Sequence, residues 1–267
     1  MILGFDFETT GVEPQKDRAI EMGAVLFDKQ FNPIAQFSAY IWDETVGQIS
    51  PEVSELTRIS MRDLQTMGIP FDVALRKMHS ELLQDQKIDG ILAHNAVFDK
   101  SVFRSEVDRY NVGYATNLLV LPWVCSRRDL ASNKKMRCQK LSHLALDYGV
   151  VVDPSTLHRA VGDVRLMGQM LQAAKADWSD MLRRAQAQKV IVQADVPSPF
   201  GPRGDGGRGK ELAKANGYRW EDPGEESGQK WEKRWVKQIL EFELDEEARL
   251  MPFPVRVLAR ITTQNLV

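Results

Sequence analysis

The first eleven residues, MILGFDFETTG (Met1–Gly11), join a hydrophobic run to two acidic side chains. The apolar residues from Ile2 to Phe7 predict a buried β-strand, and Asp6 and Glu8 lie at its carboxyl end. Because the two acids are two positions apart, both side chains point to the same face of a sheet. Two buried carboxylates on one face are unfavourable unless a cation compensates them, and oxygen ligands suit Mg²⁺ or Mn²⁺. The alternative is that both acids flank a turn and reach solvent.

Two more acids occur close to predicted helix starts. Asp99 follows a short predicted strand in ILAHNAVFDKSVF (91–103) and opens a helix. Asp163 begins another helix in HRAVGDVRLMGQML (158–171), and His158 precedes it by five residues. Each has a structural alternative, since acids are favoured in the first turn of any helix and a lone histidine is usually structural. Open α/β sheets place their sites at the carboxyl ends of strands, so the four acids together favour a metal site.

The order of the predicted elements indicates an α/β fold. Three strands come first as a meander, at residues 2–8, 18–28 and 34–42. Ser50 and Pro51 then mark a helix start. Two later strands alternate with helices, and we expect these strands at 89–95 and 117–126. The helices are expected within 71–85, 96–110, 141–148, 163–174 and 177–190. A meander followed by alternating strands and helices favours a mixed sheet flanked by helices.

A Pro- and Gly-rich stretch, ADVPSPFGPRGDGGRG (194–209), interrupts the globular pattern. It has almost no apolar anchors and is therefore expected to be a linker. We expect three parts along the chain, namely a domain over 1–192, a linker over 193–209 and a small α+β C-terminal module over 210–267.

The C-terminal module contains Trp220, Trp231 and Trp235 among basic residues. Aromatic and basic side chains together can stack on bases and contact phosphates. The equally weighted alternative is that a unit this small needs tryptophans for its core. A protein partner for the module also remains open.

Composition excludes several classes of protein. With 43% hydrophobic and 27% charged residues, the 267-residue chain resembles an ordinary globular protein. A net charge of −2 argues against binding nucleic acid by bulk charge alone. No apolar run approaches the roughly 18 residues that span a membrane, and the N-terminus lacks the features of a secretory signal. Cys125 and Cys138 are too few for a disulfide framework, so we expect a reduced, cytoplasmic protein.

Local charge is more informative than net charge. The stretch RRDLASNKKMRCQK (127–140) holds six basic residues and one acid. A charge run of this kind is usually a solvated face. Beside a site that handles anions it would contact phosphates, and Lys134, Lys135 and Arg137 are the candidates.

Three short motifs resemble those of a known family. DFETTG (6–11), HNAVFD (94–99) and HRAVGD (158–163), in this order, resemble the three motifs of the DEDDh, or DnaQ-like, 3′→5′ exonucleases. That family includes the proofreading epsilon subunit of bacterial DNA polymerase III. The resemblance covers about residues 1–174 and implies a ribonuclease-H-like mixed five-stranded sheet flanked by helices. One departure is LTRIS (56–60), where many members have His-Gly-Ile-Thr.

The resemblance also implies a catalytic apparatus. The expected ligands of two Mg²⁺ or Mn²⁺ ions are the carboxylates of Asp6, Glu8, Asp99 and Asp163. Of these, Asp99 would act mainly through metal-bound water. His158 is the expected general base, because an ordinary histidine pKa near 6.5 lets it accept a proton near neutral pH.

The implied substrate is nucleic acid, most simply single-stranded DNA or a DNA 3′ end, from which nucleoside 5′-monophosphates are released. The residues expected to contact it are Phe7, Thr9, Thr10, Asn95, Phe98, Lys134, Lys135 and Arg137. Asn95, with His94, is also a candidate for capping the helix of Asp99. Two alternatives stay open, a 3′→5′ exoribonuclease with the same catalytic residues and a catalytically silent nucleic-acid-binding or polymerase-accessory protein.

Overall fold

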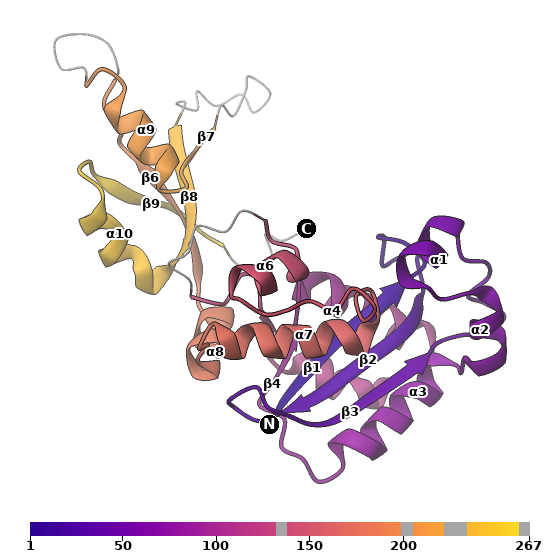
Figure 1. Ribbon diagram of the computed structural model, residues 1–267. Helices are drawn as coiled ribbons and strands as arrows, with labels where there is room; N and C mark the ends of the chain where they lie inside the picture. The colour runs from indigo at the N-terminus through magenta and orange to yellow at the C-terminus, as the bar shows by residue number, and fades with distance from the viewer. Residues whose placement is uncertain (132–137, 199–204, 222–233, 262–267) are drawn as a thin grey trace. The chain divides into compact units, whose positions relative to one another are not determined.

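The computed structural model describes residues 1–131, 138–198, 205–221 and 234–261. The chain divides into two compact units, Met1–Ala185 and Gln186–Val267 (Figure 1).

A mixed five-stranded sheet forms the centre of the first unit, which confirms the predicted ribonuclease-H-like architecture. In spatial order β3-β2-β1-β4-β5, its strands are Pro33–Tyr40, Ala19–Phe27, Ile2–Thr9, Gly90–Ala93 and Trp123–Cys125. β1, β2 and β3 pair antiparallel, whereas β4 pairs parallel with both β1 and β5. The pairing of β1 with β4 ends at Gly4. The half of β1 that carries Asp6 and Glu8 therefore extends beyond its parallel neighbour.

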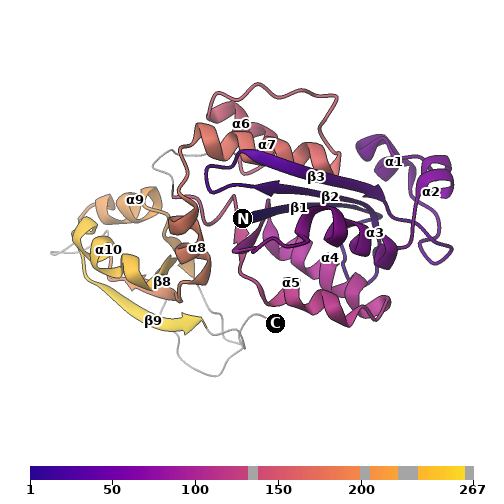
Figure 2. The ribbon, with the colours of Figure 1, turned by 90° about the horizontal axis from the view of Figure 1, so that it is seen from below.

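Helices cover both faces of this sheet (Figure 2). On one face, α3 (Phe71–Met78) and α4 (Ala96–Arg109) pack against Leu3, Phe5 and Phe7 of β1. Alternate residues of a strand point to opposite faces, so Asp6 and Glu8 point away from this core.

The opposite face is covered by α6 (Leu141–Asp147) and α7 (Ala160–Ala173), and α8 (Trp178–Gln186) adds Trp178 and Met181 to the same core. These helices bury Ile2 and Val25 of the sheet. The remaining helical segments of this unit are α1 (Pro51–Thr57), α2 (Met61–Met67), the π-helical turn η1 (His79–Leu83), the 3₁₀ turn η2 (Gly113–Ala115) and α5 (Thr116–Val120). The predicted start of α1 is confirmed, since the Ser50 side chain accepts a hydrogen bond from the backbone of Val53.

The N-terminal end of α7 lies directly on the sheet because two glycines leave room for it. A Cβ atom at Gly23 of β2 would overlap the backbone of Ala160 and Val161. A Cβ atom at Gly4 of β1 would overlap the side chain of Val164. This close packing brings the first turn of α7 to the carboxyl half of β1.

The strand predicted at 117–126 is wrong over its first half. α5 ends at Val120, and β5 spans only Trp123–Cys125. Leu118 and Leu121 pack against the core at helical spacing, and a short apolar run does not distinguish a buried helix from a strand. Pro122 ends the helix, since the residue before a proline disfavours helical geometry and Leu121 is extended.

The second unit contains an antiparallel sheet in the order β7-β8-β6-β9. Its strands are β6 (Lys189–Ala194), β7 (Arg219–Glu221), β8 (Arg234–Leu240) and β9 (Val255–Ile261). Its helical segments are α9 (Arg208–Ala215), the 3₁₀ turn η4 (Glu241–Glu243) and α10 (Leu244–Leu250).

The domain boundary expected at residue 192 falls inside β6. Val190, Val192 and Ala194 are buried in alternation, and β6 pairs with β8 and β9, so the strand belongs to the second unit. The helix expected over 177–190 accordingly ends at Gln186. The Pro- and Gly-rich stretch connects β6 to α9 within the second unit, and its residues 199–204 lie outside the described residues. The sequence does not predict β6 as a strand because the strands that pair with it follow about 40 or more residues later, so the local pattern does not reveal them.

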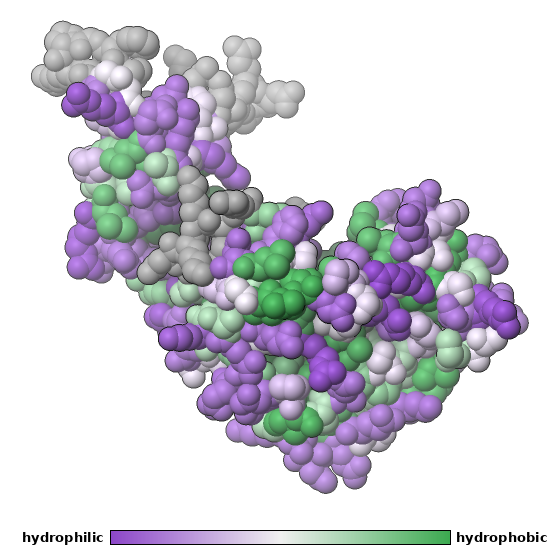
Figure 3. All heavy atoms as spheres, in the orientation of Figure 1, coloured by the Kyte–Doolittle hydropathy of each residue, from purple (hydrophilic) through white to green (hydrophobic). Residues whose placement is uncertain are grey.

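Hydrophilic side chains cover most of the face of the first unit in Figure 3, and an apolar group lies over α6. Leu146 of α6 and Val151, shortly after it, are exposed. In the described part of the chain, every helix is too short or too polar to cross a membrane.

Candidate active site

Three carboxylates meet at the carboxyl half of β1. Asp6 and Glu8 come from β1, and Asp163 comes from the first turn of α7. One oxygen of each lies within 4.8 Å of the other two. Oxygens at such separations can share one divalent cation.

Asp99 and His158 lie beside this cluster. Asp99 is 2% exposed and accepts a hydrogen bond from the backbone of Phe7. It stands outside the group of three, but its charge acts on Asp6. His158 has a left-handed φ of 56°, and its backbone N–H hydrogen-bonds to Asp163. All five residues singled out by the motifs therefore occupy one end of the sheet.

Burial raises the pKa of every acid in this site. It is the largest cause for each of the four carboxyl groups. The pKa of Glu8 and that of Asp99 rise to about 8, and that of Asp163 rises to about 6. The pKa of Asp6 is raised well above its ordinary value by burial and then by the neighbouring negative charges. Without a cation, the site therefore favours protonated carboxyl groups.

The donor set fits a hard divalent cation. Among the described residues, the buried Oδ1 atom of Asp163 has no hydrogen-bond partner. The cluster consists of carboxylates, without cysteine or histidine, which favours Mg²⁺ or Mn²⁺ over Zn²⁺. A cation here would satisfy the Asp163 oxygen and remove the repulsion between the acids.

A buried carboxylate outside the three motifs holds the start of α7. Glu21 of β2 has no exposed surface and accepts hydrogen bonds from Arg159 at 2.8 Å and from the backbone of Ala160 at 3.0 Å. Glu21 is also the cross-strand neighbour of Glu8. Its signal in the sequence was the same as that of Asp6, namely an acid in an otherwise apolar strand.

The segment 56–60, where the family resemblance is weakest, contacts the loop before His158. Arg58 has a left-handed φ of 59°. Its guanidinium donates to the carbonyl oxygens of Pro154 at 2.7 Å and Ser155 at 2.8 Å. The Arg58 charge also lowers the pKa of His158, after the larger effect of burial. The departure LTRIS thus ties the His158 loop to the end of α1.

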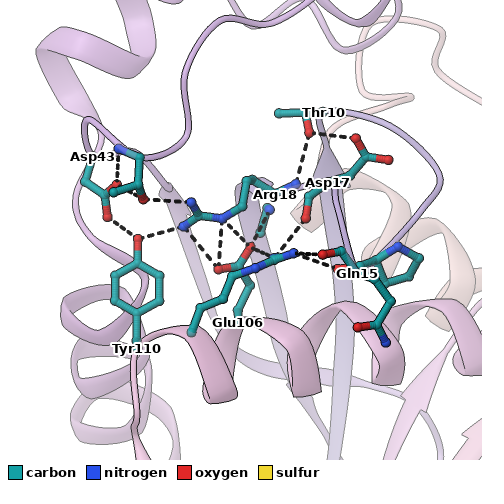
Figure 4. Close-up of polar contacts among 11 residues, drawn as sticks. Thr10, Gln15, Asp17, Arg18, Asp43, Glu106 and Tyr110 are labelled. Atoms are coloured by element: carbon teal, nitrogen blue, oxygen red, sulfur yellow. Dashed lines mark hydrogen bonds and ion pairs between the residues drawn. The ribbon is translucent and has the colours of Figure 1, made fainter.

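Figure 4 shows a polar network that holds the loop after β1, residues 10–18. Glu106 of α4 has no exposed surface and accepts from Arg18 at 3.1 Å and from Arg109 at 3.0 Å. Arg109 also donates to three backbone carbonyl groups of the loop. Two arginines therefore compensate one buried carboxylate, and the network joins this loop to the helix that carries Asp99.

The two threonines of the first motif differ in their contacts. The Thr9 hydroxyl donates to the carbonyl of Gly11 at 2.5 Å. The Thr10 hydroxyl donates to Asp17 at 3.2 Å and accepts from the backbone of Arg18 at 2.9 Å. The Thr10 hydroxyl is thus engaged within the loop as both donor and acceptor and the Thr9 hydroxyl as a donor, and contact of either with a nucleotide stays a prediction.

The turn between β4 and α4 anchors both ends of the basic stretch 127–140. Asn95 occupies the N-cap position of α4, but its side chain accepts from Arg127 at 3.1 Å and makes no capping hydrogen bond. His94 lies 2.9 Å from the Gln139 carbonyl through Nε2 and 2.8 Å from Ser126 through Nδ1. Since a carbonyl only accepts, Nε2 carries the proton and Nδ1 accepts from the serine hydroxyl.

The other residues predicted to contact the substrate differ in how far they are accessible at the site. The Phe7 ring is buried in the core, so only its backbone is available at the site. Phe98 is half-buried against the same core. Lys134, Lys135 and Arg137 lie outside the described residues.

Comparison with known proteins identifies the first unit. A family model described as an exonuclease (RNase_T) matches residues 3–171, from β1 almost to the end of α7. The chain belongs to this exonuclease family. The chain is 30% identical to the DNA polymerase III epsilon subunit of Treponema pallidum over 162 residues, which are 61% of this chain and 70% of that subunit. It is 31% identical over 170 residues to a PolC-type DNA polymerase III of Thermotoga petrophila, of which it covers 11%.

Solved structures share the fold of the first unit. Escherichia coli exonuclease I in complex with a dT13 oligonucleotide matches with a TM-score of 0.56 and 18% identity, over 76% of this chain and 49% of that chain. The nuclease domain of 3′hExo, a DEDDh family member bound to rAMP, matches with a TM-score of 0.54 and 18% identity, over 64% and 89% of the two chains. The chain thus spans about half of exonuclease I. Its family depends on divalent metal ions, for which the acidic cluster is present.

We expect the metal-free protein to lose stability as the pH rises from about 4 to about 8. The pKa values of Glu8 and Asp99 in the folded protein, about 8, exceed those of ordinary carboxyl groups in the unfolded chain. Unfolding then releases protons in this range, so the free energy of unfolding falls with rising pH. Thermal unfolding in EDTA across this range measures the effect.

Adding Mg²⁺ or Mn²⁺ at pH 8 should restore the stability, because a cation binds the deprotonated carboxylates of the folded state. Asp108→Asn removes an exposed acid of α4 and should leave the pH dependence unchanged. A melting temperature that is independent of pH, or one that the metals leave unchanged, would contradict the assigned cluster.

Proposed function

We propose that the chain is a divalent-metal-dependent 3′→5′ exonuclease that acts on DNA and releases nucleoside 5′-monophosphates. The observation that carries the proposal is the meeting of Asp6, Glu8 and Asp163 within 4.8 Å, with Asp99 and His158 beside them. The relationship to DNA polymerase III subunits supports DNA as the substrate, and the free Cys125 and Cys138 are compatible with a cytoplasmic protein.

In this proposal each group of the site has a defined task. Asp6, Glu8 and Asp163 would hold two Mg²⁺ or Mn²⁺ ions, with Asp99 at the margin. When bound, such ions supply a nucleophilic water and neutralise the charge that develops on the leaving oxygen. His158 would accept the proton of the attacking water, since burial and the charges of Arg58 and Lys140 lower its pKa and keep the ring neutral at pH 7.

Substrate contacts would come from both sides of this cluster. The backbone of Phe7 and Glu8 and the hydroxyl of Thr9 would hold the terminal nucleotide, with Asn95 and Phe98 nearby. The basic stretch 127–140 would contact the phosphates of the strand through Lys134, Lys135 and Arg137. The anchoring of residues 127 and 139 at the turn before α4 supports this placement.

Digestion of end-labelled substrates tests the proposal. A 5′-labelled single-stranded DNA should give a ladder of progressively shorter labelled products in Mg²⁺ or Mn²⁺. An inverted nucleotide at the 3′ end should block the reaction, because attack starts there. Matched duplex DNA and RNA of the same sequence complete the set, and Asp163→Asn is the inactive control.

Any other pattern of digestion products would indicate a different function. Immediate release of a labelled mononucleotide would indicate the opposite direction. Preferential digestion of RNA would make the chain an exoribonuclease. The nuclease domain of 3′hExo, which has the same fold, was solved with bound rAMP. Binding of all substrates without cleavage would indicate a silent accessory protein.

A further inference from the structure

Two tryptophans pair across the edge of the second sheet. Trp220 of β7 lies opposite Trp235 of β8, with ring centroids 5.3 Å apart and planes inclined by 59°. Trp235 is 8% exposed and belongs to the core of this unit, whereas Trp220 is 50% exposed. Each tryptophan therefore fits a different interpretation. Trp235 supplies the core of the module, and Trp220 presents a ring to solvent on which a base could stack. Trp231 lies outside the described residues.

The exposed ring borders a pocket of about 640 Å³ within the second unit. Its apolar lining comes from Trp220, Trp235, Val196 and Pro197. A volume of this size suits a nucleotide or another small ligand. Because Trp220 rests on a buried partner, it is held in place before any ligand arrives.

The charged groups of the pocket are both positive. Lys210 and Lys214 line it from α9, and their spacing of four residues puts them on the same side of that helix. Lys214 makes an exposed ion pair with Glu211 at 3.4 Å. In the described part of the chain, Lys210 makes no ion pair, and no carboxylate lines the pocket. Its charge therefore complements an anion.

We propose that this pocket binds single-stranded nucleic acid, with a base stacked on Trp220 and flanking phosphates contacted by Lys210 and Lys214. Stacking on an aromatic ring tolerates any base, and basic side chains that line the same pocket can contact the phosphates of the strand. The pocket contains none of the catalytic carboxylates, so it holds the strand without cleaving it. This second binding site goes beyond the proposed function of the first unit.

Fluorescence anisotropy of the full chain in EDTA tests this site without hydrolysis. The probes are 5′-fluorescein (dT)20 and 5′-fluorescein (rU)20, which distinguish DNA from RNA. Trp220→Ala should weaken binding by about tenfold, or about 1.4 kcal/mol, and Trp220→Phe should retain most of the affinity. The double variant Lys210→Gln with Lys214→Gln should lower the slope of log affinity against log salt by about 1.4, since each single-strand phosphate contact contributes about 0.7.

Arg256→Gln with Arg260→Gln is the matched control. These exposed arginines lie on β9, at the opposite edge of the same sheet, and the pair removes the same charge. Their loss should leave the slope and the tryptophan effect unchanged. Thermal unfolding checks that every variant is folded.

Several results would overturn the site. Equal affinity of Trp220→Ala and the parent for both probes removes the stacking role. An equal loss of slope in the arginine control makes the effect one of general charge. Pocket variants that bind both probes normally but lose a protein partner would make that partner the occupant. Failure of the proposed function is distinguishable, because binding is measured without cleavage and Trp220→Ala should digest a short oligonucleotide at the parent's rate.

Discussion

Replacing Asp6 by asparagine is expected to reduce the rate of hydrolysis by at least about a thousandfold while the protein stays folded. Asp6 lies on the central strand β1, and one of its oxygens lies within 4.8 Å of an oxygen of Glu8 and of Asp163. Losing this carboxylate removes an anchor for cations that supply several kcal/mol of transition-state stabilisation, and each 1.4 kcal/mol is a factor of ten. Single-turnover digestion of 5′-labelled single-stranded DNA at saturating Mg²⁺ measures the loss.

The same substitution should raise stability when metal is absent. Burial and neighbouring charges raise the pKa of Asp6, so asparagine replaces a group that repels the other acids. In EDTA at pH 8, the melting temperature of Asp6→Asn should equal or exceed that of the parent. The control Asp108→Asn should change neither rate nor stability. A rate for Asp6→Asn within tenfold of the parent would refute the metal-site assignment.

Replacing His158 should reduce turnover by about a hundredfold to ten-thousandfold, the usual contribution of a general base. His158→Ala removes the ring but keeps the backbone N–H that binds Asp163. His158→Asn is a second variant, because asparagine tolerates the left-handed backbone at this position without supplying a comparable base. Agreement between the two variants separates loss of the base from loss of local geometry. Rates at pH 6 to 9 provide the measurement.

Metal affinity distinguishes a base from a ligand at this position. A titration with Mn²⁺ should give both His158 variants the affinity of the parent. A variant that no longer binds Mn²⁺ would make His158 a ligand. Arg58→Ala offers a useful contrast, because Arg58 holds the carbonyl groups of Pro154 and Ser155 and acts on His158 through that loop and through its charge. Its loss should therefore reduce turnover less than loss of His158.

Local pattern was a reliable guide where neighbours in sequence are also neighbours in space. The apolar run of β1, the serine cap before α1 and the helical spacing of α4 and α7 all appear where expected. It misled where the decisive contact is distant. The run at 117–126 became a helix and a short strand because its leucines pack on a core built by β1, α3 and α4. The end of the first unit was misplaced because β6 pairs with strands much later in the chain.

The buried charged residues also divide into those that the sequence could predict and those that depend on distant contacts. Glu8 and Asp163 could be grouped with Asp6 by their motifs, since the chemistry of a hard cation requires several carboxylates. Glu21 and Glu106 have no exposed surface but lie outside the motifs, and their partners Arg159 and Arg18 lie 138 and 88 residues away. A charge pair separated in this way leaves no local pattern, so it emerges only from the folded chain.

By itself, the sequence determined which residues are the candidates for the chemistry, the first four strands and most helices of the first unit, and the family resemblance of that unit, because residue type, local periodicity and motif order are properties of the chain. The tertiary structure alone decided that Asp163 reaches Asp6, that the Thr10 hydroxyl is engaged in its loop, and that Trp220 is exposed while Trp235 is buried. Each of these depends on close packing between segments far apart in the sequence. Gly23 illustrates the reason, since a side chain there would overlap the backbone of α7, and only the folded chain shows that α7 packs against this residue.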